Sequence, residues 1–378
     1  MTSFDVAVIG GGIIGGSIAF ELAGHKLRVA LFDRQQPGRE ASWAAAGMLS
    51  PAPDSPAAIP LVPLGRASLD LYPAFVASVE DASGQKAGFR HEGALELLFA
   101  GDAERELSTL IALHHGLGLP AEPLRLEEAQ EIEPDLARDA RGAALIANEA
   151  CVDNRALTAA VLAAASARGV ALRAPAAVTA LLREKNRCTG VVAAGEKISA
   201  GHVVLSAGCY SGSIEGLSAC APTHPTRGQM VALLSPQARI RRVLRSEHGY
   251  LVPRDDARPQ KLVAGSTLEN AGFEKKTTAS GIQQILSAAL ELVPRLADAE
   301  IVETWSGLRP DTPDHLPILG PAELQGLVIA TGHFRNGILL APITAKLIRE
   351  WITEGSTSLS IEPFSPLRFL AARHGPGA

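Results

Sequence analysis

The sequence lacks the cysteine pattern that would indicate a disulfide framework or a metal site. Its four cysteines, Cys151, Cys188, Cys209 and Cys220, include no Cys-x-x-Cys pair and have no metal-like spacing to histidine. We therefore expect reduced thiols, no bound metal and a cytoplasmic location.

An excess of basic residues is also missing. Lys and Arg number 35 against 40 Asp and Glu, for a net charge of −5, so the chain has no broad cationic surface for nucleic acid or anionic lipid. Hydrophobic residues make up 47% and charged residues 20% of the chain, values typical of a globular enzyme rather than a disordered protein. Nucleic acid is therefore not expected as a partner.

No apolar run is long enough to cross a membrane. The longest Ala/Leu stretch, residues 156–167, is bounded by Arg155 and Arg168 and falls short of the ~20 residues that a span requires. The first apolar run contains Asp5 and has no basic leader, which does not fit a secretory signal. These patterns predict a soluble protein with no membrane span.

The N-terminal segment has the pattern of a strand, a helix and a second strand. Residues 4–9 and 27–32 are short apolar runs suited to buried parallel strands, and residues 13–23 have a helical pattern. With ~100–200 residues per domain, a chain of 378 residues predicts two or three domains, the first of which begins with this βαβ unit.

The rest of the chain alternates between helical and strand patterns. Five prolines in residues 50–64 predict a loop that could act as a lid, with no regular element before a helix at 66–80. Asp153 is placed to cap a helix at 155–168. Other predicted helices cover residues 104–116, 280–293 and 338–354. Other predicted strands cover residues 94–99, 176–182, 188–193, 202–206, 230–234, 249–253, 261–265 and 327–331. The short strands between residues 230 and 265 are separated by turn residues, a pattern that predicts an antiparallel sheet in a separate domain.

The glycine cluster between the first strand and helix carries a dinucleotide-binding pattern. Residues 10–15 read Gly-Gly-Gly-Ile-Ile-Gly and satisfy G-x-G-x-x-G. Gly10 permits the tight turn, Gly12 lets backbone amides approach a pyrophosphate, and Gly15 allows close packing of the helix. Asp33 ends the second strand, where it can accept hydrogen bonds from a ribose. The alternative is a purely structural turn, and the pattern does not distinguish NAD from FAD.

Five segments together resemble the D-amino-acid-oxidase-like family of FAD enzymes, and within it the glycine/sarcosine oxidase group, above all the thiamine-pathway glycine oxidases. The segments are VAVIGGGIIGGSIA near the N-terminus, ASWAAAGML, VVLSAG, ETWSGLRPDTPDHLPILG and ATGHFRNGILLAPITAKLI. This resemblance spans nearly the whole chain.

The resemblance implies an α/β architecture with two domains. A Rossmann-type FAD-binding domain would be assembled from residues 1–84, 142–221 and 303–367. A smaller substrate domain with a mixed or antiparallel sheet would comprise residues 85–141 and 222–302, and residues 368–378 would form a tail. The likeness to glycine oxidases also implies a homo-oligomer, a tetramer.

The resemblance also implies which residues contact FAD. The expected contacts are Gly10, Gly12, Ile13, Ile14, Gly15, Asp33, Arg34, Ala41, Ser42, Ala46, Gly47, Met48, Val178, Ala207, Gly208, His333, Phe334, Arg335, Asn336, Gly337, Ile338 and Leu339. No cysteine follows Cys220, so the thioether link to flavin of some sarcosine oxidases cannot form around residues 308–314, and we expect non-covalent FAD.

Residues 335–337 form a polar turn between a predicted strand and a predicted helix. The N-terminus of that helix would point past the strand end, where its dipole could stabilise the negative charge of a reduced flavin. Pro342 is expected in the first helical turn, because proline is tolerated there. A plain strand-turn-helix connection is the alternative.

For the substrate, the Gly-Leu-Arg-Pro stretch resembles the family position whose guanidinium holds the amino-acid carboxylate, which makes Arg309 the first candidate. Tyr250 and Arg335 are second-rank candidates, Met48 would line the substrate side, and His248 would shape the electrostatics of the pocket together with His333. Each of these residues has an ordinary alternative, such as a solvated arginine or a packed histidine.

The implied reaction is oxidation of a small amino acid, glycine first, with sarcosine and small D-amino acids as further substrates. A hydride would pass from Cα to flavin N5, the imine would hydrolyse to a 2-oxo acid and ammonia, and dioxygen would be reduced to hydrogen peroxide. Three alternatives remain open: a flavin dehydrogenase of D-amino acids or proline that reduces a quinone or carrier, a flavin module acting on modified tRNA bases, and a protein that binds FAD without turnover.

Overall fold

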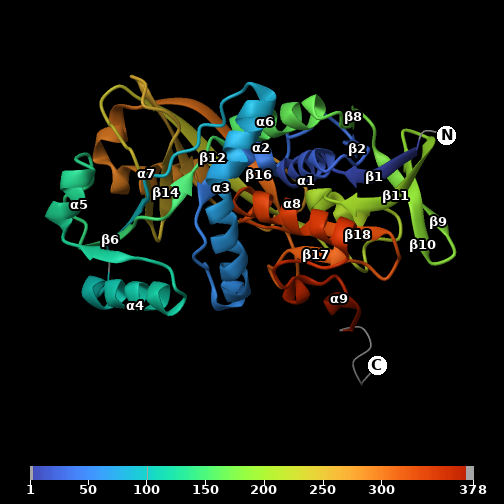
Figure 1. Cartoon of the computed structure of the whole chain (residues 1–378). Helices are drawn as coiled ribbons and strands as arrows, with labels where there is room; N and C mark the ends of the chain where they lie inside the picture. The colour runs from blue at the N-terminus through green and yellow to red at the C-terminus, as the bar shows by residue number, and fades with distance from the viewer. Residues whose placement is uncertain (1–2, 100, 372–378) are drawn as a thin grey trace.

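A computed structural model of the chain describes residues 3–99 and 101–371. Two large sheets lie side by side along the long axis of the molecule (Figure 1). One sheet combines strands from both ends of the chain with strands between residues 171 and 205, and the other combines strands between residues 94 and 146 with strands between residues 224 and 311. The architecture is therefore mixed α/β, as the sequence predicted.

The first sheet contains the predicted N-terminal strands. β1 (Ser3–Ile9) pairs in parallel with β2 (Val29–Phe32) and with β11 (Glu196–Leu205), which pairs in parallel with β18 (Leu327–Thr331). β8 (Ala171–Arg173) and β17 (Ile318–Pro321) are the outer strands. A hairpin of β9 (Val178–Glu184) and β10 (Arg187–Ala193) pairs antiparallel with β11. β1 and β18 thus both border β11, which brings segments from the two ends of the chain together.

Helices cover the first sheet because its central strands are apolar on both faces. α1 (Ile13–Gly24) packs against α8 (Gly337–Glu354) and α6 (Asn154–Ala167), and α3 (Val62–Ser83) packs against α6 and α8. The Asp153 carboxylate accepts hydrogen bonds from the Arg155 and Ala156 amides, so it caps α6 as predicted.

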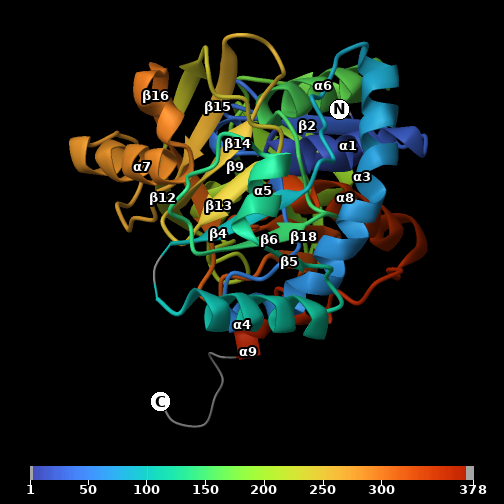
Figure 2. The same cartoon turned by 90° about the vertical axis from the view of Figure 1, so that its left-hand side faces the viewer.

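The second sheet is largely antiparallel. Its order is β16 (Glu300–Asp311), β12 (His224–Ser235), β15 (Gln260–Gly265), β14 (Gly249–Pro253), β13 (Val243–Ser246), β4 (Ala94–Leu98), β6 (Gly142–Ile146) and β5 (Glu122–Leu124). Among the described strands of this sheet, β13 and β4 pair in parallel and the other neighbours pair antiparallel. Figure 2 faces this half of the molecule, with α7 (Ala279–Leu292), α4 (Ala103–Gly116) and α5 (Leu126–Ile132) around the sheet.

Short elements complete the chain. They are α2 (Ala41–Ala44), β3 (Met48–Leu49) paired with β7 (Ala150–Cys151), the 3-10 helices at Pro56–Leu61, Gly208–Ser213, Pro294–Asp298 and Glu362–Phe364, and α9 (Arg368–Ala371). Of the predicted tail, residues 372–378 lie outside the described residues. All four cysteines are free thiols, as expected.

The proline-rich stretch differs from the sequence prediction. Residues 50–64 were expected to be a loop, with a helix only from residue 66, but a 3-10 helix covers Pro56–Leu61 and α3 begins at Val62. Pro63 is in the first turn of α3, where its missing amide costs no hydrogen bond, so proline here starts a helix instead of preventing one.

Pro342 is also not where the sequence prediction placed it. It lies inside α8, beyond the first turn. A proline at this position leaves the carbonyl of Ile338, four residues earlier, without its helical donor. The buried Tyr72 hydroxyl donates to that carbonyl at 2.7 Å, which restores the lost hydrogen bond from a neighbouring helix.

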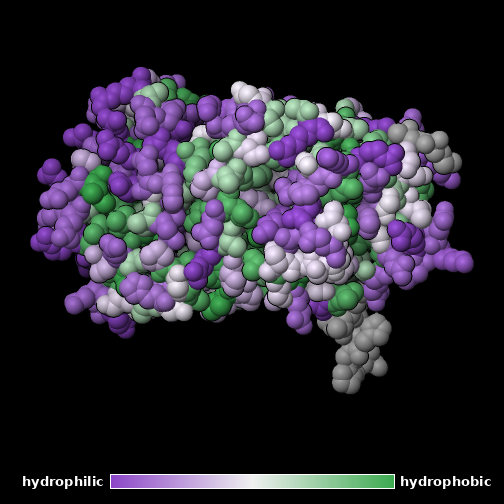
Figure 3. Space-filling view, viewed as in Figure 1, coloured by the Kyte–Doolittle hydropathy of each residue, from purple (hydrophilic) through white to green (hydrophobic). Residues whose placement is uncertain are grey.

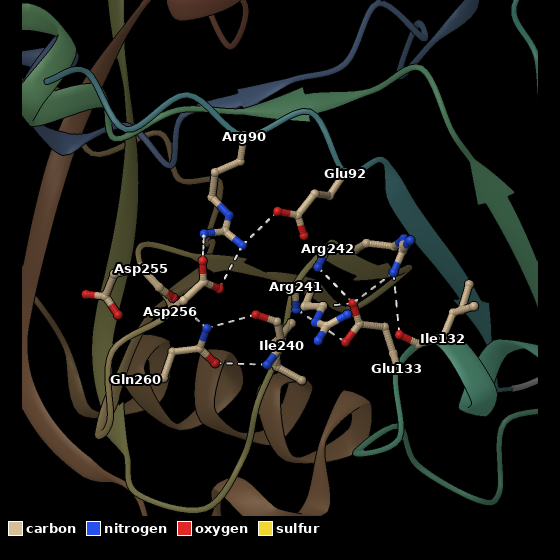
Figure 4. Close-up of polar contacts among 10 residues, drawn as sticks. All are labelled: Arg90, Glu92, Ile132, Glu133, Ile240, Arg241, Arg242, Asp255, Asp256 and Gln260. Carbon is tan, nitrogen blue, oxygen red and sulfur yellow. Dashed lines mark hydrogen bonds and ion pairs between the residues drawn. The ribbon is translucent and has the colours of Figure 1, made fainter.

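Buried polar side chains hold the segment that leads into β13 (Figure 4). Glu133 is fully buried and accepts hydrogen bonds from the backbone amides of Arg241 and Arg242. Gln260 bonds both the amide and the carbonyl of Ile240. This segment is therefore held at four backbone groups before β13 begins.

The face of the molecule drawn in Figure 3 is polar over much of its area. Figure 3 shows hydrophilic side chains over much of one face, with hydrophobic ones in scattered patches. Within the described residues, no helix has both the length and the apolar character needed to cross a membrane.

Candidate active site

A cavity of about 1260 Å³ lies between the two sheets. Its wall on one side comes from the carboxyl ends of β1, β2, β11 and β18, and on the other from β4, β13, β14 and β16. Ligand pockets in proteins usually measure about 300–1,000 Å³. The cavity is therefore large enough for a cofactor together with a second, smaller ligand.

The glycine turn at the start of α1 forms one end of this cavity. Gly10 has φ +104°, and a Cβ there would lie 2.4 Å from the Ser206 carbonyl oxygen, while a Cβ on Gly15 would lie 1.9 Å from the Gly10 carbonyl oxygen. Gly10 and Gly15 are therefore required by the fold itself. A Cβ on Gly12 would meet only the Ser42 hydroxyl at 3.1 Å, so Gly12 keeps open space in front of the helix N-terminus.

Asp33 lies beside this turn at the end of β2. Its carboxylate accepts a hydrogen bond from the Gly11 amide at 2.8 Å. The next residue, Arg34, stacks its guanidinium 3.5 Å from the centre of the Tyr210 ring and pairs with Glu40 at 2.9 Å. Tyr210 carries no sequence signal, because it reaches the cavity only through the fold.

These features fit an FAD molecule. The helix N-terminus and the space at Gly12 suit a pyrophosphate, and Asp33 is within reach of a ribose next to that position. Val178, Ala207 and Gly208 line the same end of the cavity.

The segment that follows α2 lines the centre of the cavity with small side chains. Gly47 has φ +81°, and a Cβ there would lie 2.0 Å from the Val152 carbonyl oxygen. The Asn154 amide nitrogen donates to the carbonyls of Ser42 and Trp43 at 2.7 and 3.0 Å, and the Trp305 indole donates to the Ala44 carbonyl at 3.1 Å. The backbone is thus held in place and can approach a planar ring system closely.

The connection between β18 and α8 forms another wall. His333 is buried, and its Nε2 lies 3.1 Å from the Thr344 hydroxyl. Burial lowers the pKa of His333 to about 3, so its imidazole is neutral at physiological pH. Residues 333–340, including Asn336 at the N-cap of α8, all line the cavity.

Arg309 is a partly buried cation of the cavity that has no counterion among the described residues. Its guanidinium donates to the Ser266 hydroxyl at 2.7 Å and to the Thr267 carbonyl at 3.1 Å, and no carboxylate pairs with it among the described residues. Burial lowers its pKa from the ordinary value, against the opposing effect of nearby Tyr250. A partly buried arginine without an acid partner favours an anionic ligand.

The other predicted substrate residues lie around Arg309 at different depths. The Tyr250 hydroxyl lies 3.5 Å from the Met230 sulfur, and Met48 packs in the same cluster. Arg335 pairs with Asp54 of the proline-rich stretch, and its side chain is 43% exposed. His248 pairs with Glu291 at 2.9 Å, which raises the pKa of the imidazole, and its side chain is 53% exposed.

The fold brings almost all predicted site residues together. Every one of them lines this cavity except Gly15, which packs behind the turn. Sequence reasoning missed further lining residues, namely Ser206 within the VVLSAG segment, and Glu96, His114, Tyr210 and Arg245, which belong to no motif.

Known proteins are similar to the chain over most of its length. The DAO family, described as FAD dependent oxidoreductase, matches residues 5–351. A glycine oxidase from Geobacillus kaustophilus is 34% identical over 97% of both chains. A bifunctional ThiO/ThiG protein from Trichormus variabilis is 36% identical over 97% of this chain, which spans 55% of that protein's length.

A crystal structure agrees with the sequence comparisons. The structure of glycine oxidase from Geobacillus kaustophilus superimposes with a TM-score of 0.90 at 32% identity, covering 97% of this chain and 99% of that one. The cavity geometry and the extent of these matches lead to one assignment: the chain belongs to the DAO family of FAD-dependent oxidoreductases.

Proposed function

We propose that this protein oxidises small amino acids, with glycine as its first substrate and sarcosine and small D-amino acids as further ones. The observation that carries the proposal is Arg309, a guanidinium without an acid partner in a cavity whose other end is built for a dinucleotide. The similarity to glycine oxidases supports the same substrate class.

Arg309 binds the substrate carboxylate, and the Tyr250 phenol completes that end of the site. A planar guanidinium can form two parallel hydrogen bonds to a carboxylate, which fixes the orientation of Cα. Ser266 and the Thr267 carbonyl hold the guanidinium in place. Met48 packs along the same wall, while Arg335 and His248 lie nearer the solvent and influence the charge at the mouth.

When bound, FAD would supply the hydride acceptor at N5. With water hydrolysing the imine and dioxygen as the final electron acceptor, glycine would give a 2-oxo acid, ammonia and hydrogen peroxide. The protein contributes orientation and electrostatics: amides at the start of α1 for the pyrophosphate, Asp33 for the ribose, and the N-terminus of α8 for the negative end of the ring system.

FAD is held without a covalent bond. Cys209 is the cysteine that lines the cavity, and burial raises the pKa of its thiol to about 12. A thiol that stays protonated is a poor nucleophile.

The remaining features of the proposal are a homotetramer, a cytoplasmic location and a role in thiamine biosynthesis. The similarity to the ThiO/ThiG protein supports the last of these.

The test combines spectroscopy with oxygen consumption. The purified protein is expected to show a flavin spectrum that glycine, sarcosine, D-alanine or D-proline bleaches under anaerobic conditions, with the L-amino acids as comparison. In air, glycine is expected to cause oxygen uptake and peroxide formation. Reduction of a dye or quinone without oxygen uptake would assign the protein as a dehydrogenase, and a flavin that no amine reduces would contradict the proposed function.

A further inference from the structure

An arginine of the second sheet supports residues 42–47, which line the centre of the cavity. Arg254 directly follows β14, and its amide donates to the Lys261 carbonyl at 3.0 Å, which continues the pairing of β14 with β15. Tyr250 lies four residues earlier on the same extended segment, so the two side chains project from the same face. The strand that presents Tyr250 to the cavity therefore also directs Arg254 toward residues 42–47.

The Arg254 guanidinium binds two uncharged acceptors. Nη1 donates to the Val152 carbonyl at 3.0 Å, and Nη2 donates to the side-chain oxygen of Asn154 at 2.8 Å. Among residues 3–99 and 101–371, no carboxylate forms an ion pair with Arg254. Burial lowers the pKa of Arg254 from its ordinary value, and nearby Asp153 opposes this effect. Hydrogen bonds from a charged donor are stronger than neutral ones, so the guanidinium fixes both acceptors in place.

The Val152 carbonyl packs directly against Gly47. A Cβ on Gly47 would lie 2.0 Å from this carbonyl oxygen and 3.3 Å from Nη1 of Arg254. The Val152 amide in turn donates to the Gly47 carbonyl at 2.9 Å. Arg254 therefore holds the peptide group against which Gly47 rests.

Asn154 extends the same support to the start of the segment. It is fully buried, and its amide nitrogen donates to the carbonyls of Ser42 and Trp43 at 2.7 and 3.0 Å. The side-chain oxygen of Asn154 faces the guanidinium, so Arg254 fixes the amide in the orientation that these two carbonyls require. A flipped amide would place its oxygen against both carbonyls.

We propose that Arg254 is a positioning residue for the flavin half of FAD. Through Val152 and Asn154 it holds residues 42–47 where their backbone would contact the ring system, while Arg254 itself lies outside the cavity lining. The adenosine half does not depend on Arg254, because the Ser42 hydroxyl also accepts a hydrogen bond from the Ile13 amide at 2.9 Å. The inference rests on the FAD site of the proposed function and not on which amine is oxidised.

Binding of FAD and of ADP to the apoprotein tests this role, because ADP has the adenosine and pyrophosphate of FAD but no flavin. For Arg254→Met, we expect the dissociation constant of FAD to rise at least about ten-fold, the lower end of what a hydrogen bond to a charged group contributes. The constant for ADP should change by less than about two-fold, since no hydrogen bond at the pyrophosphate is lost. Titration calorimetry measures both constants. An unchanged FAD constant, or equal losses for FAD and ADP, would overturn the inference.

Arg242→Met is the matched control. Arg242 is also a partly buried arginine that donates to a backbone carbonyl, that of Ile132 at 3.4 Å, but it lies outside the cavity and far from residues 42–47. We expect this variant to bind FAD as the wild type does. A loss of FAD affinity as large as that of Arg254→Met would indicate general destabilisation and would reject the positioning role.

Two further variants follow the hydrogen bonds from Arg254 to the segment. Arg254→Lys keeps the charge and a donor, so its FAD affinity should lie closer to that of the wild type than the affinity of Arg254→Met does. Combining Arg254→Met with Asn154→Ala should cost less FAD affinity than the product of the two single losses, because both act along one chain of contacts. A full product would contradict transmission through Asn154. If Arg254→Met does not fold, Asn154→Ala alone should show the selective loss of FAD, and equal losses of FAD and ADP would overturn the inference.

Glycine oxidation separates this inference from the proposed function. If the wild type oxidises glycine and Arg254→Met binds FAD as the wild type does, the proposed function stands and the positioning role is wrong. If no amine is oxidised but Arg254→Met selectively loses FAD, the positioning role stands and the proposed substrate class is wrong.

Discussion

Single residues set the charge inside the cavity, and Arg309 contributes most. Two glycines leave space for the Arg309 guanidinium and the Tyr250 hydroxyl. A Cβ on Gly228 would lie 2.2 Å from the guanidinium, and a Cβ on Gly265 would lie 2.6 Å from the hydroxyl. Sequence motifs pointed to Arg309 itself. They could not show that no acid pairs with it, because ion pairing depends on which strands become neighbours.

Replacing Arg309 tests its role in substrate binding. Arg309→Ala removes a charged hydrogen-bonding group of about 1.5–3 kcal/mol, so kcat/KM for glycine is expected to fall by about 10- to 150-fold, mainly through KM. The flavin content should stay at the wild-type level. Arg138→Ala, an exposed arginine away from the cavity, is the control. Unchanged glycine kinetics in Arg309→Ala would reject the carboxylate role.

The buried histidine of the β18–α8 connection predicts a pH dependence of stability. The pKa of His333 in the folded protein is about 3, while an unfolded histidine has a pKa near 6.5. As the pH falls, the unfolded chain therefore binds a proton before the folded protein does. The contribution of the neutral His333 to the free energy of unfolding is lost as the pH falls from about 6.5 toward 3. Between pH 7.5 and pH 5 this loss amounts to about 2 kcal/mol.

Urea unfolding at pH 7.5 and pH 5 measures this effect. His333→Gln removes the titrating group, so its free energy of unfolding should fall less between the two pH values than that of the wild type. His91→Gln, an exposed histidine, should show the wild-type dependence. Identical pH dependence for wild type and His333→Gln would contradict a buried neutral histidine.

At the scale of secondary-structure elements, the glycines of the turn before α1 serve two purposes: some are required by the fold, and one is required by the cofactor. The fold requires Gly10 and Gly15, since side chains there would collide with backbone, whereas Gly12 only keeps space open at the cavity. All three glycines fit one sequence pattern. Their different roles become visible only when the neighbouring atoms are known.

A substitution at Gly12 should therefore affect FAD more than folding. Gly12→Val places a branched side chain where the pyrophosphate would approach, and we expect a folded protein that purifies with little or no flavin. Absorbance at 450 nm measures the flavin, and circular dichroism the fold. Gly116→Ala, where a Cβ would meet no atom within 4 Å, is the control. Stoichiometric yellow cofactor in Gly12→Val would count against this placement of FAD.

The segment that leads into β13 yields a prediction about stability. Glu133→Ala leaves the amides of Arg241 and Arg242 without acceptors (Figure 4), and we expect a loss of about 1–3 kcal/mol in the free energy of unfolding. Urea denaturation measures the change, with the neighbouring exposed Glu131→Ala as control. A difference below about 0.5 kcal/mol between the two variants would show that water replaces the carboxylate.

At the scale of the whole molecule, several arginines join the two halves, and Arg155 is one of them. Arg155, on α6, pairs with Glu303 of β16 through two contacts of 2.9 and 3.2 Å. Its guanidinium lies 3.6 Å from the centre of the Trp43 ring and 4.5 Å from that of Trp305. The two aromatic residues flank the segment that lines the centre of the cavity, so this contact links the halves and positions the cavity wall.

A double-mutant cycle measures the strength of that link. Arg155→Ala and Glu303→Ala remove the same pair, so their effects on the free energy of unfolding should not add. We expect an interaction energy of about 0.5–2 kcal/mol, favourable in the wild type. The exposed pair Arg125 and Glu128, within one segment, is the comparison and should give less than about 0.5 kcal/mol. Additive effects at Arg155 and Glu303 would contradict a link between the halves.

The sequence by itself determined the βαβ start, most strands and helices, the α/β class and the family, because these depend on local hydrophobic periodicity and on contiguous motifs. The sequence prediction was wrong about where the helix after the proline-rich stretch begins, which is Val62. It was also wrong about Pro342, which lies in the interior of α8 and not in its first turn. A 3-10 turn before Pro63 and a hydroxyl from Tyr72 on another helix decide them.

Only the tertiary structure decided which charges meet. The carboxylates of Glu96 and Glu149 and the guanidinium of Arg245 come from three distant parts of the chain, and none of them belongs to a motif. Pairing of β13 with β4 places Arg245 beside Glu96 at the cavity wall, and Arg245 also reaches the buried Glu149. Electrostatic energy depends on distance in space and on burial, and neither can be read from positions along the chain.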